Sequence, residues 1–343
     1  MRPPTPADRG ASVPGIPVVT GSPHLDSARI ESARAVTSGP AASFLSFPGS
    51  AEALARLPEH PPHLADAGLG AGGCFARPLP VDTTCAAAAR RYFREATSAL
   101  SLPSGLLHDG VTMASELAAN TLHAQRNVAV SAPRQRAAAG IPELWLYLRG
   151  TGRTRELVCK VFDTERDWNA GIAPGMDRAP EDSVSGRGLQ VVAGLSAGQW
   201  GCHLSRSRLG TWRVPGKAVW FALRIPPAAL ASHVGRPRYS PEWLTDELEA
   251  MLADRGLAGG IVRADMADIS VLSLSRHLTV WRHGDQVCWR APSGPYQQCD
   301  LADLVEVVEQ IVCAQEEAAQ GESARGEAAQ EESAQEESAQ GLA

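Results

Sequence analysis

Hydrophobic and polar residues follow a regular period only after about residue 73. Residues 1–73 mix Pro, Gly, Ala and Ser without sustained periodicity, so we expect a disordered N-terminal arm. Between residues 104 and 124 the apolar positions recur every three or four residues, which is the period of one helical face. This face consists of Leu107, Val111, Ala114, Ala118 and Leu122.

The rest of residues 74–230 alternates between helical and strand-like segments. A strand over FARPLP and a helix over TTCAAAARRYFREATSALSL precede the 104–124 helix. The strands ELWLYLRG and ELVCKVFD follow it, and an irregular Pro-, Gly- and Asp-rich segment covers residues 164–185. Next come a helix that begins at GLQVVAGL and strands at QWGCHLSR, GTWRVPG and KAVWFALRIP. This order predicts an α+β fold with helices on one face of a mixed β-sheet.

Residues 231–313 predict a linker helix followed by a small unit of strands and one helix. Ser240 as the N-cap, Pro241 at the first helical position and Gly256 past the end bracket a helix over PEWLTDELEAMLADR. Strands are expected at GGIVRA, ISVLSLS, LTVWRH and QVCWRAP, with a hairpin turn at HGDQ, before a helix over LADLVEVVEQIV. We therefore expect a second, smaller α/β unit in this region.

Negative charge is concentrated at the C-terminus. Residues 314–343 contain eight Glu and one Arg, a net charge of −7, so the total of −6 leaves about +1 for the rest of the chain. This segment has no apolar helical face, so we expect an acidic, disordered tail that, like the N-terminal arm, adds nothing to stability. The nearly neutral remainder has no basic stripe of the kind that binds nucleic acid.

Cysteine usage and hydropathy indicate the cellular compartment. The seven cysteines are scattered and never spaced as CxxC, which argues against a zinc site and a disulfide framework. This usage favours a reducing cytoplasm. No run of 18 apolar residues occurs, and the first residues lack the apolar stretch of a secretory signal. We therefore expect a cytoplasmic protein that does not enter the membrane.

Three segments of residues 74–230 carry side chains that could bind a ligand or take part in catalysis. The segment SELAANTLHA places Glu116 and Asn120 on one helical stripe, because residues four apart differ by about 40° around a helix. Asp163 ends an apolar strand, and SGRGL begins the next helix. Each feature alone has an ordinary structural explanation: a solvated helix face, a turn-forming Asp and a flexible helix start. Their order along the chain favours a functional explanation.

Taken together, these segments resemble the GHKL ATPase superfamily and, within it, the bacterial anti-sigma-factor serine kinases. SELAANTLHA is similar to the N-box, and VFDTERDW lies where the first glycine box begins. SGRGLQVVAGLSAGQWG is similar to the second glycine box, and GKAVWFAL to the last strand. The resemblance spans residues 75–226 and implies a GHKL-type sandwich of helices on a β-sheet that binds ATP with Mg²⁺.

The resemblance also implies a role for each matching residue. Asn120 would give its amide oxygen to Mg²⁺, and Glu116 would act as the general base toward a serine hydroxyl or water. Asp163 would accept a hydrogen bond from the adenine amino group. Contacts with the phosphates at the start of a helix would come from Gly186, Arg187 and Gly188.

Two functions remain open from the sequence. The resemblance implies a protein serine kinase whose partner is a sigma factor or an anti-sigma-factor antagonist, and family members often form homodimers. The alternative is an ATP-binding interaction module with little or no kinase activity. This alternative is favoured by the run Thr164, Glu165, Arg166, Asp167, since the family has glycines soon after the aspartate. No paired dimerisation helices with a phospho-accepting His precede the domain, which argues against a sensor histidine kinase.

Overall fold

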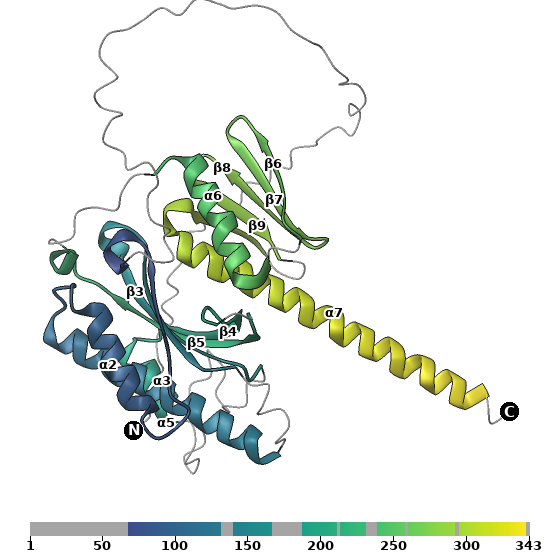
Figure 1. Ribbon diagram of the computed structural model, residues 1–343, viewed down its shortest axis with the longest axis horizontal. Helices are drawn as coiled ribbons and strands as arrows, with labels where there is room; N and C mark the ends of the chain where they lie inside the picture. Colours follow the sequence, from purple (N-terminus) through teal and green to yellow (C-terminus); the bar gives the residue numbers. More distant parts are fainter. Residues whose placement is uncertain are drawn as a thin grey trace, which may run out of the picture. The chain divides into compact units, whose positions relative to one another are not determined.

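The computed structural model describes residues 68–131, 140–166, 187–210, 213–230, 239–257, 260–291 and 295–340. These ranges form an α+β structure with two five-stranded antiparallel sheets and five α-helices (Figure 1). Residues 1–67 of the predicted N-terminal arm lie outside the described residues. Among the helices in the described ranges, none has the length and apolar character needed to cross a bilayer.

The first sheet has the strand order β1-β2-β3-β5-β4, and every neighbouring pair is antiparallel. The prediction of a mixed sheet is therefore wrong. Strands β3 and β4 run in the same direction, as is typical of strands joined through a helix, but β5 lies between them and is antiparallel to both. The strands are β1 (Cys74–Pro78), β2 (Glu143–Arg149), β3 (Glu156–Asp163), β4 (Trp200–Arg206) and β5 (Pro215–Arg224).

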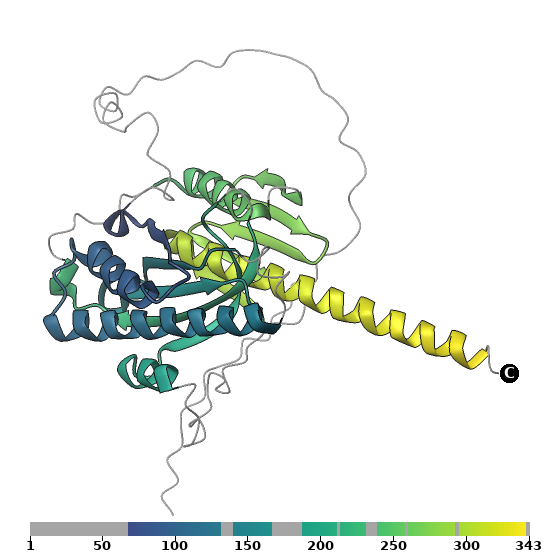
Figure 2. The same cartoon turned by 60° about the horizontal axis from the view of Figure 1, so that its bottom comes forward.

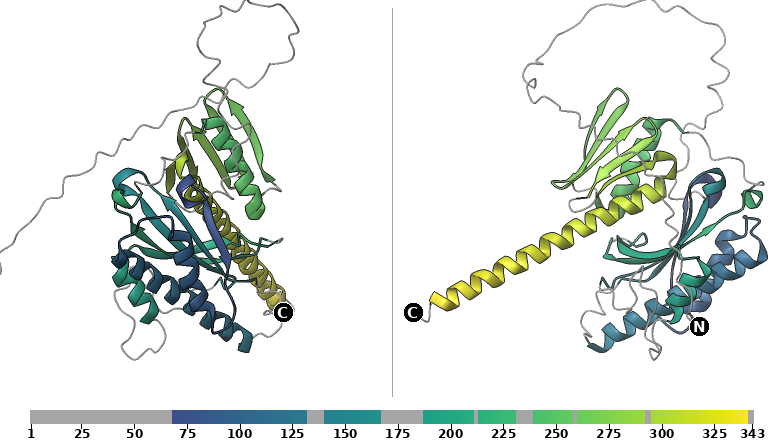
Figure 3. Two further views of the ribbon diagram at one scale, coloured as in Figure 1. Left: turned by 60° about the vertical axis from the view of Figure 1, so that its left-hand side comes forward. Right: turned by 180° about the vertical axis from the view of Figure 1, so that it is seen from behind.

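Three helices cover one face of this sheet: α2 (Cys85–Thr97), α3 (Ser104–Ser131) and α5 (Arg187–Leu195) (Figure 3). Every second residue of a strand points to this face, because successive side chains alternate across a sheet. Helices α2 and α3 pack very closely, since a Cβ on Gly110 would lie 2.3 Å from the Phe93 ring. The buried strand residues on this face include Leu144, Leu146, Cys159, Val161 and Phe221.

The opposite face of the first sheet is also buried. Trp145 and Phe162 stack there with ring centroids 5.5 Å apart, and they belong to a second hydrophobic core. This core includes α6 (Pro241–Leu252), α7 (Leu304–Gln340) and the second sheet. Burial on both faces accounts for the nearly continuous apolar sequence of β2 and β3.

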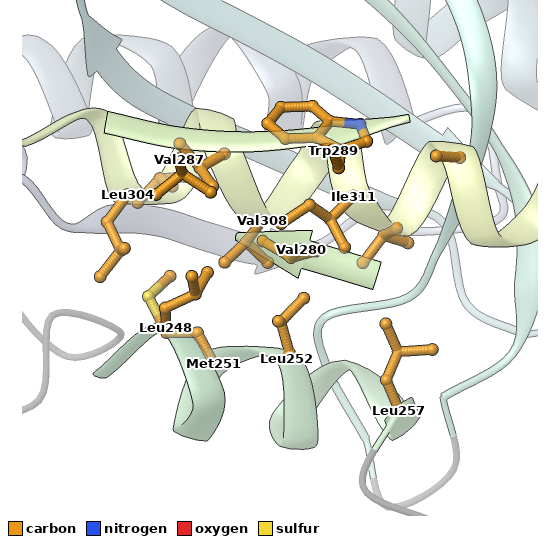
Figure 4. Close-up of a cluster of buried hydrophobic side chains, with 14 of the residues drawn as sticks. Leu248, Met251, Leu252, Leu257, Val280, Val287, Trp289, Leu304, Val308 and Ile311 are labelled. Carbon is orange, nitrogen blue, oxygen red and sulfur yellow. The ribbon is translucent and has the colours of Figure 1, made fainter. Parts of the chain in front are cut away.

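The second sheet has the order β10-β9-β8-β7-β6 and packs one face against α6 and α7. In Figure 4, side chains of α6 and α7 meet those of β8 and β9, including the buried Trp289. The predicted strands before the final helix are confirmed, but β10 was not predicted because YQQCD has no apolar alternation. The strands are β6 (Val262–Met266), β7 (Ile269–Ser275), β8 (Leu278–His283), β9 (Gln286–Arg290) and β10 (Tyr296–Asp300).

The predicted start of α6 is confirmed, but the helix ends at Leu252 rather than Arg255, and a π-helical segment follows it over Ala253–Leu257. The Ser240 hydroxyl accepts a hydrogen bond from the Trp243 N–H at 3.2 Å, and Pro241 occupies the first turn. Gly256 has a φ of +77°, a left-handed conformation that favours glycine at the end of a helix. Short 3₁₀ and π segments complete the structure at Leu69–Ala71, Gly152–Thr154, Pro227–Leu230, Ala253–Leu257 and Leu301–Asp303.

Helix α7 continues through the segment that was predicted to be disordered. It runs without a break from Leu304 to Gln340, so the prediction of a disordered tail is wrong for residues 314–340. Residues 341–343 lie outside the described residues. One carboxylate of this segment, Glu316, is buried and pairs with Arg166 and Arg206, which the acidic composition of the segment did not indicate.

Glu309 is the centre of a buried ionic cluster. Its carboxylate is 0% exposed and lies 3.0 Å from Nη2 of Arg208 and 3.4 Å from Nζ of Lys160. Nη1 of Arg255 contacts the same carboxylate. Burial alone would raise the pKa of Glu309, but the attraction of Arg255, Lys160 and Arg208 holds its pKa well below the usual value. The carboxylate is therefore ionised at neutral pH and neutralises cations that are largely buried.

We expect Glu309→Gln to lower the free energy of unfolding by about 3–5 kcal/mol at pH 7, because it leaves buried cations unpaired. A depressed folded-state pKa gives stability that is present above the pKa of the unfolded chain and is lost as the pH falls through the folded value. The difference from the wild type should therefore shrink below about pH 4.5. Urea denaturation across this range measures it. Glu317→Gln, on the exposed side of α7, is the control, and an equal effect of both variants would contradict the role of Glu309.

Truncation of α7 should separate its packed part from its outer part. Glu322, paired with Arg276, makes the last contact that the described side chains of α7 form with another element. A chain ending at Arg325 keeps this pair and should therefore keep its thermal midpoint within about 2 °C, since it loses only residues beyond that contact. A chain ending at Val312 loses the buried Glu316 and should melt at least about 5 °C lower. Equal midpoints in calorimetry would show that α7 does not contribute to stability beyond Val312.

Candidate functional site

Helices α3 and α5 lie side by side and bring three of the predicted site residues together (Figures 1 and 2). Glu116 and Asn120 belong to α3, and Gly188 is the second residue of α5. A Cβ on Gly188 would lie 2.6 Å from Oε2 of Glu116 and 3.5 Å from both Oδ1 and Nδ2 of Asn120. Glycine at this position therefore allows the start of α5 to approach the Glu–Asn stripe directly.

The polar groups of this stripe lack protein partners. Glu116 and Asn120 are half-buried, and the neighbouring Leu117 and Ala118 are fully buried. Among the described residues, the Glu116 carboxylate forms no hydrogen bond or ion pair, and Nδ2 of Asn120 is buried without a hydrogen-bond partner. A buried amide without a partner costs about 1–3 kcal/mol, and such groups in native proteins often have a functional explanation.

The first turn of α5 adds backbone donors to these side chains. The N–H groups that begin a helix have no partner within it and attract anions. Arg187, the first residue of α5, has an exposed side chain, whereas Gly186 lies outside the described residues. Within the described parts of the chain, no cluster of three His, Cys, Asp or Glu side chains is present that could hold a metal. A metal here would depend on one or two protein oxygens together with ligand phosphates and water, which is the usual coordination of Mg²⁺.

Asp163 is buried at the end of β3, where protein groups already engage it. Lys217 lies directly opposite on β5, and its Nζ is 2.9 Å from Oδ1 of Asp163. The same oxygen accepts the N–H of Glu165 at 3.0 Å, while the hydroxyl of Thr121 donates to Oδ2 at 3.4 Å. Burial raises the pKa of Asp163, and the charge of Lys217 opposes this rise. The carboxylate therefore retains acceptor capacity mainly at Oδ2.

The contact with Thr121 places Asp163 against α3, beside the Glu–Asn stripe. Thr121 directly follows Asn120, so the structure gathers Glu116, Asn120, Asp163 and Gly188 around the middle of one helix. These residues come from α3, α5 and the end of β3, in agreement with the order of the motifs along the chain. The arrangement offers one unpaired carboxylate, one unpaired amide and one helix N-terminus to a ligand.

Lys217 and Thr121 were not identified from the sequence. Lys217 was visible as a charge in the apolar segment GKAVWFAL, but its pairing with Asp163 depends on the register between β3 and β5. Thr121 carries no signal in the sequence, because its role depends on the hydrogen bond to Asp163 at the end of β3. A lysine inside an otherwise apolar strand is the signal that predicts a buried carboxylate nearby.

No protein-family model, curated protein or solved structure matches this chain. Its function is therefore inferred from the residues around α3, α5 and β3.

Gly188→Ala should displace the Glu116 carboxylate without unfolding the protein, because the atom in its way is the end of a flexible side chain. Gly194→Ala is a matched control on the same helix, since its Cβ would meet nothing within 4 Å. Both substitutions replace Gly by Ala on the same helix, so their effects on helix propensity are similar. The resemblance implies Mg·ATP as the ligand, and for this ligand we expect only Gly188→Ala to weaken binding, by about tenfold or more, in calorimetric titration. Equal affinities of the two variants would contradict a ligand site where Gly188 meets the stripe.

Proposed function

We propose that residues 74–230 form a GHKL-type domain that binds Mg·ATP where α3 meets α5. The observation that supports this proposal is the approach of Gly188 to the unpaired side chains of Glu116 and Asn120. A metal ligand, a carboxylate and a helix N-terminus at one place suit a phosphate chain with its cation.

Each residue has a distinct role in this proposal. Asn120, whose Nδ2 has no hydrogen-bond partner among the described residues, would hold Mg²⁺ through Oδ1. The first N–H groups of α5 and the exposed Arg187 contact the phosphates. When bound, Mg²⁺ neutralises phosphate charge and polarises the bond that is to be broken.

The proposed activity is phosphate transfer to a serine of a partner protein. Glu116 lies one turn from Asn120, and no cation of the described residues pairs with its carboxylate. An unpaired carboxylate at this position is able to accept the proton of an attacking hydroxyl. The protein would then act as a regulator of the anti-sigma-factor kinase type, with a sigma factor or its antagonist as the partner.

A second candidate function is an ATP-binding module with little or no kinase activity. The specific observation in its favour is the pair between Asp163 and Lys217. The adenine amino group is a hydrogen-bond donor, and Oδ1 of Asp163 already accepts from Lys217 and Glu165. Adenine would therefore compete with protein donors for Asp163, and the phosphate end of the nucleotide would supply most of the affinity.

Two substitutions on α3 should have different effects on nucleotide binding and phosphate transfer. Glu116→Gln should keep the affinity for Mg·ATP within about threefold but lower phosphate transfer by about 10²–10⁴, the usual contribution of a general base. Asn120→Ala should weaken binding and transfer together, because the metal ligand is lost. Calorimetric titration with and without Mg²⁺ measures binding, and labelled ATP with candidate antagonists carrying an acceptor serine measures transfer. Gln190→Ala, exposed on α5, is the control.

Binding that is independent of Mg²⁺, or unchanged in Asn120→Ala, would contradict the assignment of the site. Tight, Mg²⁺-dependent binding without transfer to any tested partner would reject the kinase and support the binding module.

A further inference from the structure

Helix α7 contacts the segment that follows Asp163. The carboxylate of Glu316 is buried and lies 3.1 Å from Nη1 of Arg166. Nη2 of Arg166 also donates to the main-chain carbonyl of Glu316 at 3.5 Å. Arg206 of β4 contacts the other oxygen of the same carboxylate. Glu316 thus joins α7 to β4 and to the segment after β3, at a residue three positions after Asp163.

From Arg166 the contacts continue to the Asp163 carboxylate. The carbonyl of Glu165, next to Arg166, accepts a hydrogen bond from Nζ of Lys217 at 2.5 Å. Nζ of Lys217 also donates to Oδ1 of Asp163 at 2.9 Å, and the N–H of Glu165 donates to that oxygen at 3.0 Å. Lys217 therefore connects the main chain at residue 165 with the Asp163 side chain. Nζ of Lys217 thus contacts both groups at once.

The series of contacts ends on α3, at the candidate site. The Thr121 hydroxyl donates to Oδ2 of Asp163, and Thr121 directly follows Asn120. Hydrogen bonds, ion pairs and short stretches of main chain therefore connect α7 to the Glu–Asn stripe without interruption. Such a continuous network of specific contacts is able to carry energetic coupling between distant parts of a protein.

We propose that α7 is an autoinhibitory element that restrains the Asp163 carboxylate through Glu316 and Arg166. While Glu316 pairs with Arg166, the carbonyl of Glu165 keeps its hydrogen bond from Lys217. Lys217 in turn keeps its ion pair with Asp163. Release of Glu316 loosens residues 164–166 and makes Asp163 available to a hydrogen-bond donor on a ligand. A protein partner that draws α7 away from the first sheet would thereby favour nucleotide binding. The inference rests on the proposed function for the identity of the ligand, but not for the coupling itself.

Hydrogen exchange of the nucleotide-free, full-length protein tests the coupling. Glu316→Gln and Arg166→Gln should each speed exchange of the Glu165 amide, which donates to Asp163, by about fivefold or more. Arg206→Gln is the matched control, because it removes the other partner of Glu316 and leaves the Arg166 pair in place. It should change exchange at Glu165 by less than about twofold, whereas a merely structural role of Glu316 would give all three variants the same effect.

Titration with Mg·ATP tests the inhibitory direction. Glu316→Gln and Arg166→Gln should each raise the affinity by about fivefold or more, and the double variant should add little, because both substitutions remove one shared interaction. Unchanged exchange at Glu165, or an affinity that stays equal or falls, would overturn the proposal. If no form of the protein binds Mg·ATP, the proposed function fails, while faster exchange in the two variants alone would still support the restraint. If Glu316→Gln does not fold, Arg166→Gln alone tests the proposal. The Arg166 side chain is 30% exposed, so its substitution should be tolerated.

Discussion

The buried carboxylate of Glu309 determines how the second face of the first sheet is covered. Lys160 and Arg208 place cations on this face, and Arg255 adds a third from the end of α6. A buried cation without a partner costs several kcal/mol, so an apolar helix packed here would leave the sheet unstable. An acidic helix resolves this conflict, and the spacing of its buried carboxylates allows one face of α7 to meet the basic groups along the sheet. The second sheet and α6 then complete the same core.

Strand β3 links this ionic face to the candidate site. Lys160 and Asp163 are three residues apart on β3, so their side chains point to opposite faces of the sheet. Lys160 pairs with α7, while Asp163 reaches Lys217 and α3. Lys160 and Asp163 are both buried, so each is paired with protein groups rather than with water. The strand that contacts α7 through Lys160 therefore also carries the Asp163 carboxylate at its end.

The sequence predicted the elements that depend on local pattern. The N-cap of α6 at Ser240 and the left-handed turn at Gly256 follow from side-chain and backbone preferences of single residues, and the period of α3 follows from its apolar positions. The sequence did not predict which strands and side chains that are distant along the chain pair with each other. The fully antiparallel first sheet depends on β5 lying between β3 and β4, and the Asp163–Lys217 pair depends on their register. In α7, the buried Glu316 looks, in sequence, like a carboxylate of a solvated tail, because its partners Arg166 and Arg206 are distant along the chain.

The two ends of the candidate site differ in whether their polar side chains already have protein partners. At α5, the Glu116 carboxylate and the Asn120 amide have no partners among the described residues, so a ligand meets groups that gain hydrogen bonds on binding. At β3, Asp163 already holds Lys217 and Thr121, so a ligand there exchanges one set of bonds for another and gains little. In the proposed function, the end that receives the phosphates would supply most of the affinity, and discrimination of the base would depend on freeing Asp163. Because the contacts from α7 reach Asp163, the proposed restraint would act on base recognition.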